Sequence, residues 1–160
     1  MNIWIGNDHG GFQAKQMLLP LLEELGHTVN DIGTSSTDIV RYPYFAAQVA
    51  RAVSEGKADR GILICSTGIG MSVIANKFPG IRAALCTSTV MADMTRRHND
   101  SNILCLGGKI SGEWDLQRMV SIWLSTDYEG GRHDISLGLI AEAEEQMMSG
   151  SYWEPSDPSK

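Results

Sequence analysis

One stretch of the chain, residues 61–72, most constrains the fold, because it passes from a buried strand through a glycine-rich turn into a helix. Its first half, Gly61-Ile62-Leu63-Ile64-Cys65, is a short apolar run, which is typical of a strand buried on both faces. Its second half, Ser66-Thr67-Gly68-Ile69-Gly70, places two hydroxyl residues and two glycines before a helical pattern resumes. Such a turn leaves backbone N–H groups unpaired, and these suit a phosphate or a developing oxyanion. The sequence therefore predicts chemistry at the end of this strand, at Cys65.

Segments typical of strands alternate with segments typical of helices along the whole chain. The apolar runs predict five strands, over residues 2–6, 28–32, 61–65, 81–86 and 102–106. Helical spacing of apolar residues follows each strand, and a last amphipathic helix is expected over 135–147. Pro20 lies inside the first helical run and is expected to kink or split that helix. This alternation predicts an α/β protein with a parallel sheet, helices on both faces and right-handed connections.

Length, charge and cysteine usage narrow the class of protein. A chain of 160 residues predicts one domain, which we place over 1–148, with a polar tail over 149–160. The net charge of −6 argues against a nucleic-acid partner, and no apolar run is long enough to cross a membrane. Three cysteines, each inside an apolar run, favour reduced thiols in a cytoplasmic protein. No His/Cys spacing indicates a metal site.

The loops that follow strands one, three and four meet at one edge of such a sheet. This edge is expected to gather Asp8, His9, Cys65, Ser66 and Thr67, with Tyr42 nearby. A thiol on a glycine-rich turn at a helix start has its thiolate stabilised, so Cys65 can act as a nucleophile or as a base. The alternative is that Cys65 is a small buried apolar residue, the interpretation that we favour for Cys86 and Cys105.

Three further residues have both a functional and a structural interpretation. His98, at the end of a helix and after two arginines, is a general acid/base or a polar helix cap. His9 beside Asp8 binds phosphate or belongs to turn chemistry. Arg132, between Gly131 and His133, is an anion ligand or a solvated loop arginine.

From Asn2 to about Met147 the chain carries several motifs in order: Asn7-Asp8-His9-Gly10-Gly11, Tyr42-Pro43, residues 65–70, Ala75-Asn76-Lys77, Gly80-Ile81-Arg82-Ala83, Arg97-His98-Asn99-Asp100 and residues 128–133. Together these motifs resemble one family. That family is the B-type ribose-5-phosphate isomerases, which also includes galactose-6-phosphate and allose-6-phosphate isomerases. The resemblance implies a Rossmann-like three-layer α/β/α sandwich with a five-stranded parallel sheet and a C-terminal helix. It also implies aldose–ketose isomerisation without metal or cofactor, in a homodimer or tetramer whose active sites lie between subunits.

The resemblance also implies roles for the catalytic positions. Cys65 matches the base that moves a proton between the first two carbons of the sugar, and Thr67 matches the hydroxyl residue beside it. Some members instead use a glutamate at the position of Met71, which cannot act as a base here. His98 matches the histidine that opens the sugar ring, and it is expected to come from the partner subunit together with Asn99.

The remaining matched positions bind the substrate. The backbone of the turn that includes Ser66, Gly68 and Gly70 is expected to stabilise the enediolate oxygen. His9, Lys109 and Arg132 match phosphate-binding positions, and Asp8 and Tyr42 match residues near the sugar hydroxyls. The family often has arginine at the positions of Lys109 and Ser136. Lysine loses the bidentate fork of arginine and serine loses the charge, so the precise sugar phosphate is open.

Ribose 5-phosphate is the first expectation, and tetrose phosphates, allose 6-phosphate and galactose 6-phosphate are alternatives. A different class is a dinucleotide-binding oxidoreductase, because Gly6–Gly11 precedes a helix and Asp31 ends strand two, where a ribose-binding acid lies in such proteins. The glycine spacing, however, is not Gly-x-Gly-x-x-Gly. A third reading is a non-catalytic sugar-phosphate sensor on the same fold.

Overall fold

The computed structural model describes residues 1–153, and the chain divides into two compact units, residues 1–128 and 129–160. This division does not test the single domain predicted over 1–148, which therefore stays a prediction. Of the predicted tail, residues 149–153 form no helix or strand, and residues 154–160 lie outside the described residues.

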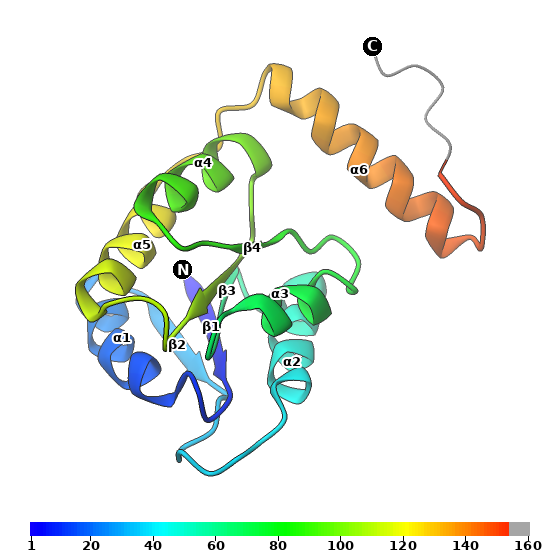
Figure 1. Ribbon diagram of the computed structural model, residues 1–160. Coiled ribbons are helices and arrows are strands. Elements are labelled where there is room, and N and C mark those ends of the chain that lie inside the picture. Colours follow the sequence, from blue (N-terminus) through cyan, green and yellow to red (C-terminus); the bar gives the residue numbers. More distant parts are fainter. Residues whose placement is uncertain (154–160) are drawn as a thin grey trace. The chain divides into compact units, whose positions relative to one another are not determined.

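The first unit contains a five-stranded parallel sheet, as predicted (Figure 1). The strand order is β2-β1-β3-β5-β4. The central strand is β3, in which Ile62 lies between Ile5 of β1 and Leu104 of β5. Cys65 is therefore the last residue of the most protected strand. The strands are β1 (Asn2–Asn7), β2 (Thr28–Asp31), β3 (Arg60–Cys65), β4 (Ala83–Leu85) and β5 (Ile103–Gly107).

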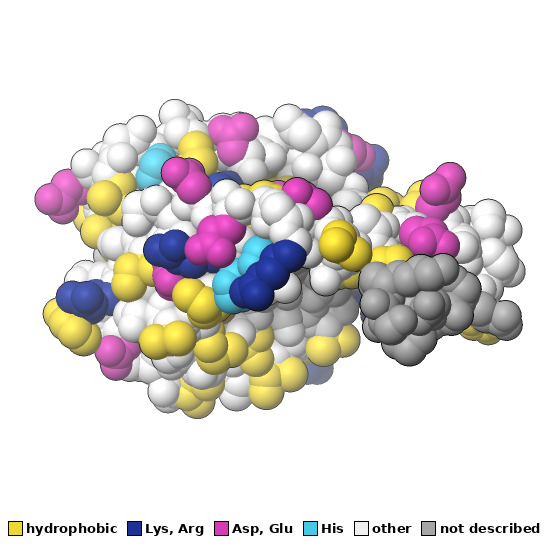
Figure 2. Space-filling view, turned by 90° about the horizontal axis from the view of Figure 1, so that it is seen from above, with side chains coloured by type: hydrophobic (Ala, Val, Ile, Leu, Met, Phe, Trp, Pro, Cys, Tyr) yellow, Lys and Arg dark blue, Asp and Glu magenta, His cyan; other side chains and the backbone are white. Residues whose placement is uncertain are grey.

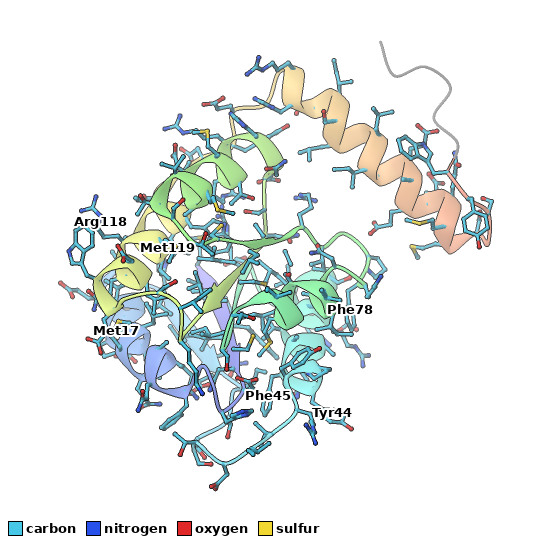
Figure 3. The ribbon with its side chains drawn as sticks, in the orientation of Figure 1. Met17, Tyr44, Phe45, Phe78, Arg118 and Met119 are labelled. Carbon is cyan, nitrogen blue, oxygen red and sulfur yellow. The ribbon has the colours of Figure 1, made fainter. Side chains whose placement is uncertain are left out.

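Five helices cover the two faces of this sheet and form two apolar cores. Side chains of α1, α4 and α5 pack on one face, and those of α2 and α3 pack on the other. Figure 3 shows this division, with Met119 of α5 and Phe45 of α2 on opposite sides of the strands. The three-layer α/β/α sandwich is confirmed. The helices are α1 (Phe12–Glu24), α2 (Tyr42–Ser54), α3 (Ile69–Ala75), α4 (Thr89–Asn99) and α5 (Glu113–Ser125).

Pro20 does not split α1, which runs unbroken on both sides of it. A proline inside a helix removes one backbone hydrogen bond and costs about 3 kcal/mol. Leu18 and Leu22 on either side of it are both completely buried against the sheet. Because most helix stability in a protein comes from packing of the apolar face, this burial offsets the loss.

The second unit contains one helix, α6 (Arg132–Met148), among its described residues. It begins three residues before the start predicted from the apolar pattern. Gly130 and Gly131 have φ of +65° and +63° and end the preceding loop, so Arg132 lies in the first turn of the helix instead of in a loop. None of the residues of α6 is buried.

No helix in the described part of the chain is apolar and long enough to span a membrane. Figure 2 shows acidic and basic side chains interspersed on the face that it presents. Among the described residues in that view, no continuous basic stripe is seen, which agrees with the net charge of −6.

Candidate active site

The Cys65 thiol lies at the carboxyl end of β3 and is 6% exposed. Its sulfur accepts a hydrogen bond from the backbone N–H of Gly68 at 3.1 Å. An N–H donor directed at sulfur stabilises the thiolate more than the thiol. Cys65 therefore differs from a buried apolar cysteine, because a polar group of the turn points at its reactive atom.

Gly68 gives the turn its shape. It precedes α3 with φ of +78°, a left-handed conformation in which a side chain would be strained. A Cβ at this position would also lie 2.6 Å from Leu85 Cδ1. The Thr67 hydroxyl accepts from the N–H of Ile69 at 3.4 Å. Two donors of the turn thus point to the side chains of Cys65 and Thr67, where the sequence had predicted free amides throughout.

The loop after β1 lies directly beside this turn. A Cβ added to Gly10 would be 2.3 Å from Ser66 Oγ and 3.2 Å from Asp8 Oδ1. Asp8 is 5% exposed and its Oδ1 accepts from the N–H of Gly10 at 2.8 Å. The structure therefore brings Asp8 and Ser66 together. The Oδ1 atom of Asp8 stabilises the loop to which Asp8 itself belongs.

Tyr42 covers the start of α3 from the first residue of α2. A Cβ added at Gly70 would lie 2.7 Å from Cζ of the Tyr42 ring, so only glycine permits this approach. The Tyr42 side chain remains 37% exposed. The phenol thus lies at the carboxyl edge of the sheet, within the same group of loops as Cys65.

The two remaining predicted ligands of this edge are held through backbone hydrogen bonds. His9 Nδ1 accepts from the N–H of Val40 at 3.3 Å, which leaves the proton of a neutral ring on Nε2. The N–H of Lys109 donates to the Ser66 carbonyl at 3.1 Å, so the loop after β5 adjoins the turn. One histidine and one lysine therefore flank the Cys65 turn.

His98 and Asn99 lie at the opposite edge of the sheet. They form the last turn of α4, which follows β4 and returns toward the amino ends of the strands. Arg82, the residue before β4, donates to the Asn99 carbonyl at 3.0 Å, which fixes this location. The structure thus does not bring His98 to Cys65 within one chain. Arg132 belongs to the second unit, where it starts α6.

Cys86 and Cys105 match the expected role of packing residues. They are 1% and 0% exposed. Burial raises the pKa of the Cys86 thiol to about 12 and raises the pKa of Cys105 well above its ordinary value. Both thiols are therefore protonated at neutral pH and lack the thiolate that chemistry needs.

Asp31, the residue on which a dinucleotide-binding site would depend, already has a partner. Both of its carboxylate oxygens lie within 3.0 Å of Lys15 Nζ. Its Oδ1 also accepts from the N–H of Gly33 at 2.9 Å. The carboxylate is committed to holding the protein's own loop, which argues against a role on a ribose hydroxyl.

Sequence reasoning missed the group around Asp100. Arg82 and Asp100 belong to the motifs of the family resemblance but carry no predicted role, and no local pattern predicts that the side chain of Arg96 is only 5% exposed. Their ion pairs join residues up to 18 positions apart. The available signal was the run Arg97-His98-Asn99-Asp100, whose last residue follows a helix end.

The fold and these loops define a class: an open α/β protein with a thiol on a glycine-rich turn at the carboxyl edge of its sheet. The family described as Ribose/Galactose Isomerase matches residues 3–140. The chain belongs to this family.

Several relatives are similar over most of their length. Ribose-5-phosphate isomerase B of Escherichia coli (strain K12) is 44% identical over 90% of this chain and 97% of its own. The structure of Clostridium thermocellum ribose-5-phosphate isomerase B matches with a TM-score of 0.90 and 47% identity, over 92% of this chain and 99% of its own. The D-erythrulose-4-phosphate isomerase of Pectobacterium atrosepticum is 37% identical over 82% of this chain and 87% of its own.

Proposed function

We propose that this protein is an aldose–ketose isomerase that converts ribose 5-phosphate to ribulose 5-phosphate through a cis-enediolate. The observation that carries the proposal is the Cys65 sulfur at the carboxyl end of the central strand, with the Gly68 N–H directed at it at 3.1 Å. Membership of the ribose/galactose isomerase family supports the reaction class, and the ribose-5-phosphate isomerase B relatives support the substrate.

Cys65 acts as the base in this proposal. Its thiolate takes the proton from carbon two of the open aldose, and the electrons of that bond form the double bond between carbons one and two. Negative charge then rests on the oxygen of carbon one, where the backbone of Ser66–Gly70 and the Thr67 hydroxyl stabilise it. The thiol returns the proton to carbon one. The proton of the carbon-two hydroxyl passes to the negatively charged oxygen of carbon one, so that carbon one carries a hydroxyl and carbon two becomes the ketone. No oxidant or reductant is consumed.

His98 opens the sugar ring, and it acts in the site of a second subunit. The support is geometric, because His98 and Asn99 end α4 at the sheet edge opposite to Cys65. A second copy of the chain can bring its own α4 end to the first copy's Cys65. The exposed apolar residues of α6, including Ile140 and Met147, agree with further burial in a homodimer or tetramer.

The proposed ligands of the substrate phosphate are His9, Lys109 and Arg132, and the proposed ligands of the sugar hydroxyls are Asp8 and Tyr42. His9 supplies an Nε2–H donor because its Nδ1 accepts from Val40. Three unpaired cysteines agree with the reducing conditions of the cytoplasm, where we place the protein.

A second candidate substrate is a tetrose or a hexose phosphate. The observation that favours it is Ser136, which lies one helical turn after Arg132 on α6, at a position that is often arginine in the family. Residues four apart share a helix face, so a serine there removes one cation from the face that carries Arg132. The D-erythrulose-4-phosphate isomerase relative agrees with a smaller substrate.

The test combines a substitution with a substrate panel. Cys65→Ala should lower turnover of ribose 5-phosphate by about 10³-fold, as expected for loss of a proton-transferring group, without a change in the melting temperature. Cys86→Ala is the matched control, because that thiol is buried elsewhere in the sheet. Near-normal activity of Cys65→Ala would refute the assignment of the base.

The same assay on tetrose, pentose and hexose phosphates decides among the substrates by kcat/KM. An intact protein that binds a sugar phosphate without turning it over, and that still binds after Cys65→Ala, would support the non-catalytic sensor instead.

A further inference from the structure

We propose that Asp100 is a positioning residue for ring opening: with Arg82 and Arg96 it fixes the end of α4, so that His98 and Asn99 are held ready for the sugar. This inference rests on the proposed function and extends it to residues that do not touch the substrate. Three features of the described residues carry it.

The first feature is the backbone of Asp100. Among the described residues it is the only one other than glycine with positive φ, at +45°. It ends α4 in a left-handed conformation, and its N–H donates to the Arg96 carbonyl at 3.2 Å. Such a conformation costs free energy for a residue with a side chain, so its surroundings must stabilise it.

The second feature is the sharing of the Asp100 carboxylate between two arginines. Its Oδ1 accepts from Arg96 at 2.8 Å and its Oδ2 accepts from Arg82 at 3.0 Å. The Arg96 side chain is 5% exposed and also donates to the Ser101 carbonyl at 2.7 Å. A buried guanidinium without a carboxylate partner is unfavourable, so Arg96 and Asp100 hold each other in place.

The third feature is that Arg82 binds the backbone of the helix end. Its Nε donates to the Asn99 carbonyl at 3.0 Å, and its Nη2 donates to the Asp100 carbonyl at 2.9 Å. Carbonyls at the end of a helix have no partner within the helix, and these bonds satisfy two of them. Since Arg82 directly precedes β4, the end of α4 is tied to the sheet at Asn99 and Asp100.

The end of a second helix, α2, has neither a left-handed residue with a side chain nor a buried guanidinium. Arg51 and Glu55 at the end of α2 have the same spacing as Arg96 and Asp100, and Glu55 likewise occupies the capping position. Yet Glu55 has φ of −85°, and the Arg51 side chain is 71% exposed. At the end of α2 the left-handed residue is the glycine that follows Glu55, Gly56, with φ of +70°. Among the described helix ends, a left-handed residue with a side chain beside a buried guanidinium occurs only at the end that carries His98 and Asn99, which points to a role in orienting them.

The experiment compares Asp100→Gly and Asp100→Asn with Glu55→Gln as the matched control. Glycine and asparagine both tolerate a left-handed conformation, so the two variants remove the shared carboxylate without backbone strain. Two rates are measured in the full-length protein. One is turnover of ribose 5-phosphate, which needs the ring to open. The other is exchange of the carbon-one proton of ribulose 5-phosphate in D2O, which needs the enediolate but no ring step.

Both Asp100 variants should lose ribose 5-phosphate turnover by about 10- to 100-fold, as expected when a reacting group is misplaced by about 1 Å. Their exchange rates should stay close to that of the wild type, as should those of His98→Asn, in which the ring-opening group itself is removed. Glu55→Gln should leave both rates unchanged.

If the Asp100 variants lose both rates in parallel, or lose neither rate, Asp100 does not act as a positioning residue for ring opening. The proposed function would still stand in that case, because the wild-type protein would be active. A wild-type protein that catalyses neither reaction would instead overturn the proposed function, and this inference with it.

Discussion

The three cysteines show how the surroundings of one residue type decide what it can do. Cys65 and Cys105 pack in the same core, and Cys86 packs in the other. Cys65 alone lies at a strand end with a backbone N–H directed at its sulfur. Burial holds the pKa of Cys86 at about 12 and that of Cys105 well above its ordinary value. The folded protein thus retains these two protons where the unfolded chain would release them.

The three thiols should therefore differ in reactivity. In native protein at about pH 8, iodoacetamide should modify Cys65 and leave Cys86 and Cys105 unmodified, because alkylation requires an accessible thiolate. Intact-mass spectrometry should show one adduct, located by peptide mapping. Sugar phosphate should slow the reaction.

Unfolding provides the control for this labelling. In denaturant all three thiols should react, and native Cys65→Ala should gain no adduct. Native labelling of Cys86 in preference to Cys65 would contradict the assignment of Cys65 as the reactive thiol.

The stability of the folded protein should also depend on pH through Cys86. Because the folded pKa of Cys86 exceeds its ordinary 9.0, the stabilisation from its burial should decline as pH rises from 9 toward 12.

At the scale of elements, a buried ion pair fastens α1 to the end of the edge strand β2. Lys15 of α1 is 1% exposed, lies 2.8 Å from Asp31 Oδ2 and also donates to the Thr34 carbonyl. It thereby holds the start of the loop that leads to Val40, the partner of His9. A substitution in this pair should therefore lower the stability of the protein and disturb His9, a proposed phosphate ligand.

Asp31→Asn should destabilise the protein more than Lys15→Met. The first change leaves a buried ammonium without its counter-charge, at a cost of about 2 kcal/mol after allowance for the partial exposure of Asp31, whereas methionine fills the space with an apolar chain. Urea unfolding of both single variants and the double variant measures this difference.

The double variant Lys15→Met/Asp31→Asn should recover part of the stability lost in Asp31→Asn, because no buried charge is then left unpaired. Glu55→Gln, which breaks an exposed pair, should not shift the urea midpoint. Equal destabilisation by Asp31→Asn and Lys15→Met would show that Asp31 is not needed to compensate the charge of the buried Lys15 ammonium.

The elements themselves followed from local pattern. The strand at Ile62–Ile64 and the helices that follow the strands were predicted because apolar periodicity is a local signal. Lys15 and Arg96 were not predicted to be buried, because a sequence pattern treats a charged residue as solvated and does not show which elements pack over it.

The grouping of the loops in the candidate site was predictable from the topology, whereas the supply of His98 by a partner was not. The parallel topology places the loops after β1, β3 and β5 at one edge, so the proximity of Asp8 and Ser66 could be expected. The topology also places His98 at the other edge, and the resemblance, not the local pattern, indicated that a partner supplies it.

On the scale of the whole molecule, the chain holds the parts of the proposed site at two opposite edges of one sheet. Cys65 ends the central strand at the carboxyl edge, and His98 ends α4 at the amino edge. Within one chain Cys65 and His98 therefore lie apart, at opposite edges of the sheet. Two copies related by twofold symmetry would complete two sites, since each gives its α4 end and receives the other's.

This arrangement predicts that two inactive variants can restore each other. Cys65→Ala and His98→Asn should each be nearly inactive on ribose 5-phosphate, since each spoils every site of its own homodimer. When equal amounts are unfolded together and refolded, half of the dimers are hybrids, and each hybrid has one site with both groups intact. Turnover should then return to about a quarter of the wild-type value per subunit. Refolding each variant alone is the control, and sedimentation must show dimers or larger assemblies. If the mixture stays as inactive as its components while hybrids form, His98 and Cys65 do not meet across subunits, and the opposed edges of the sheet need another explanation.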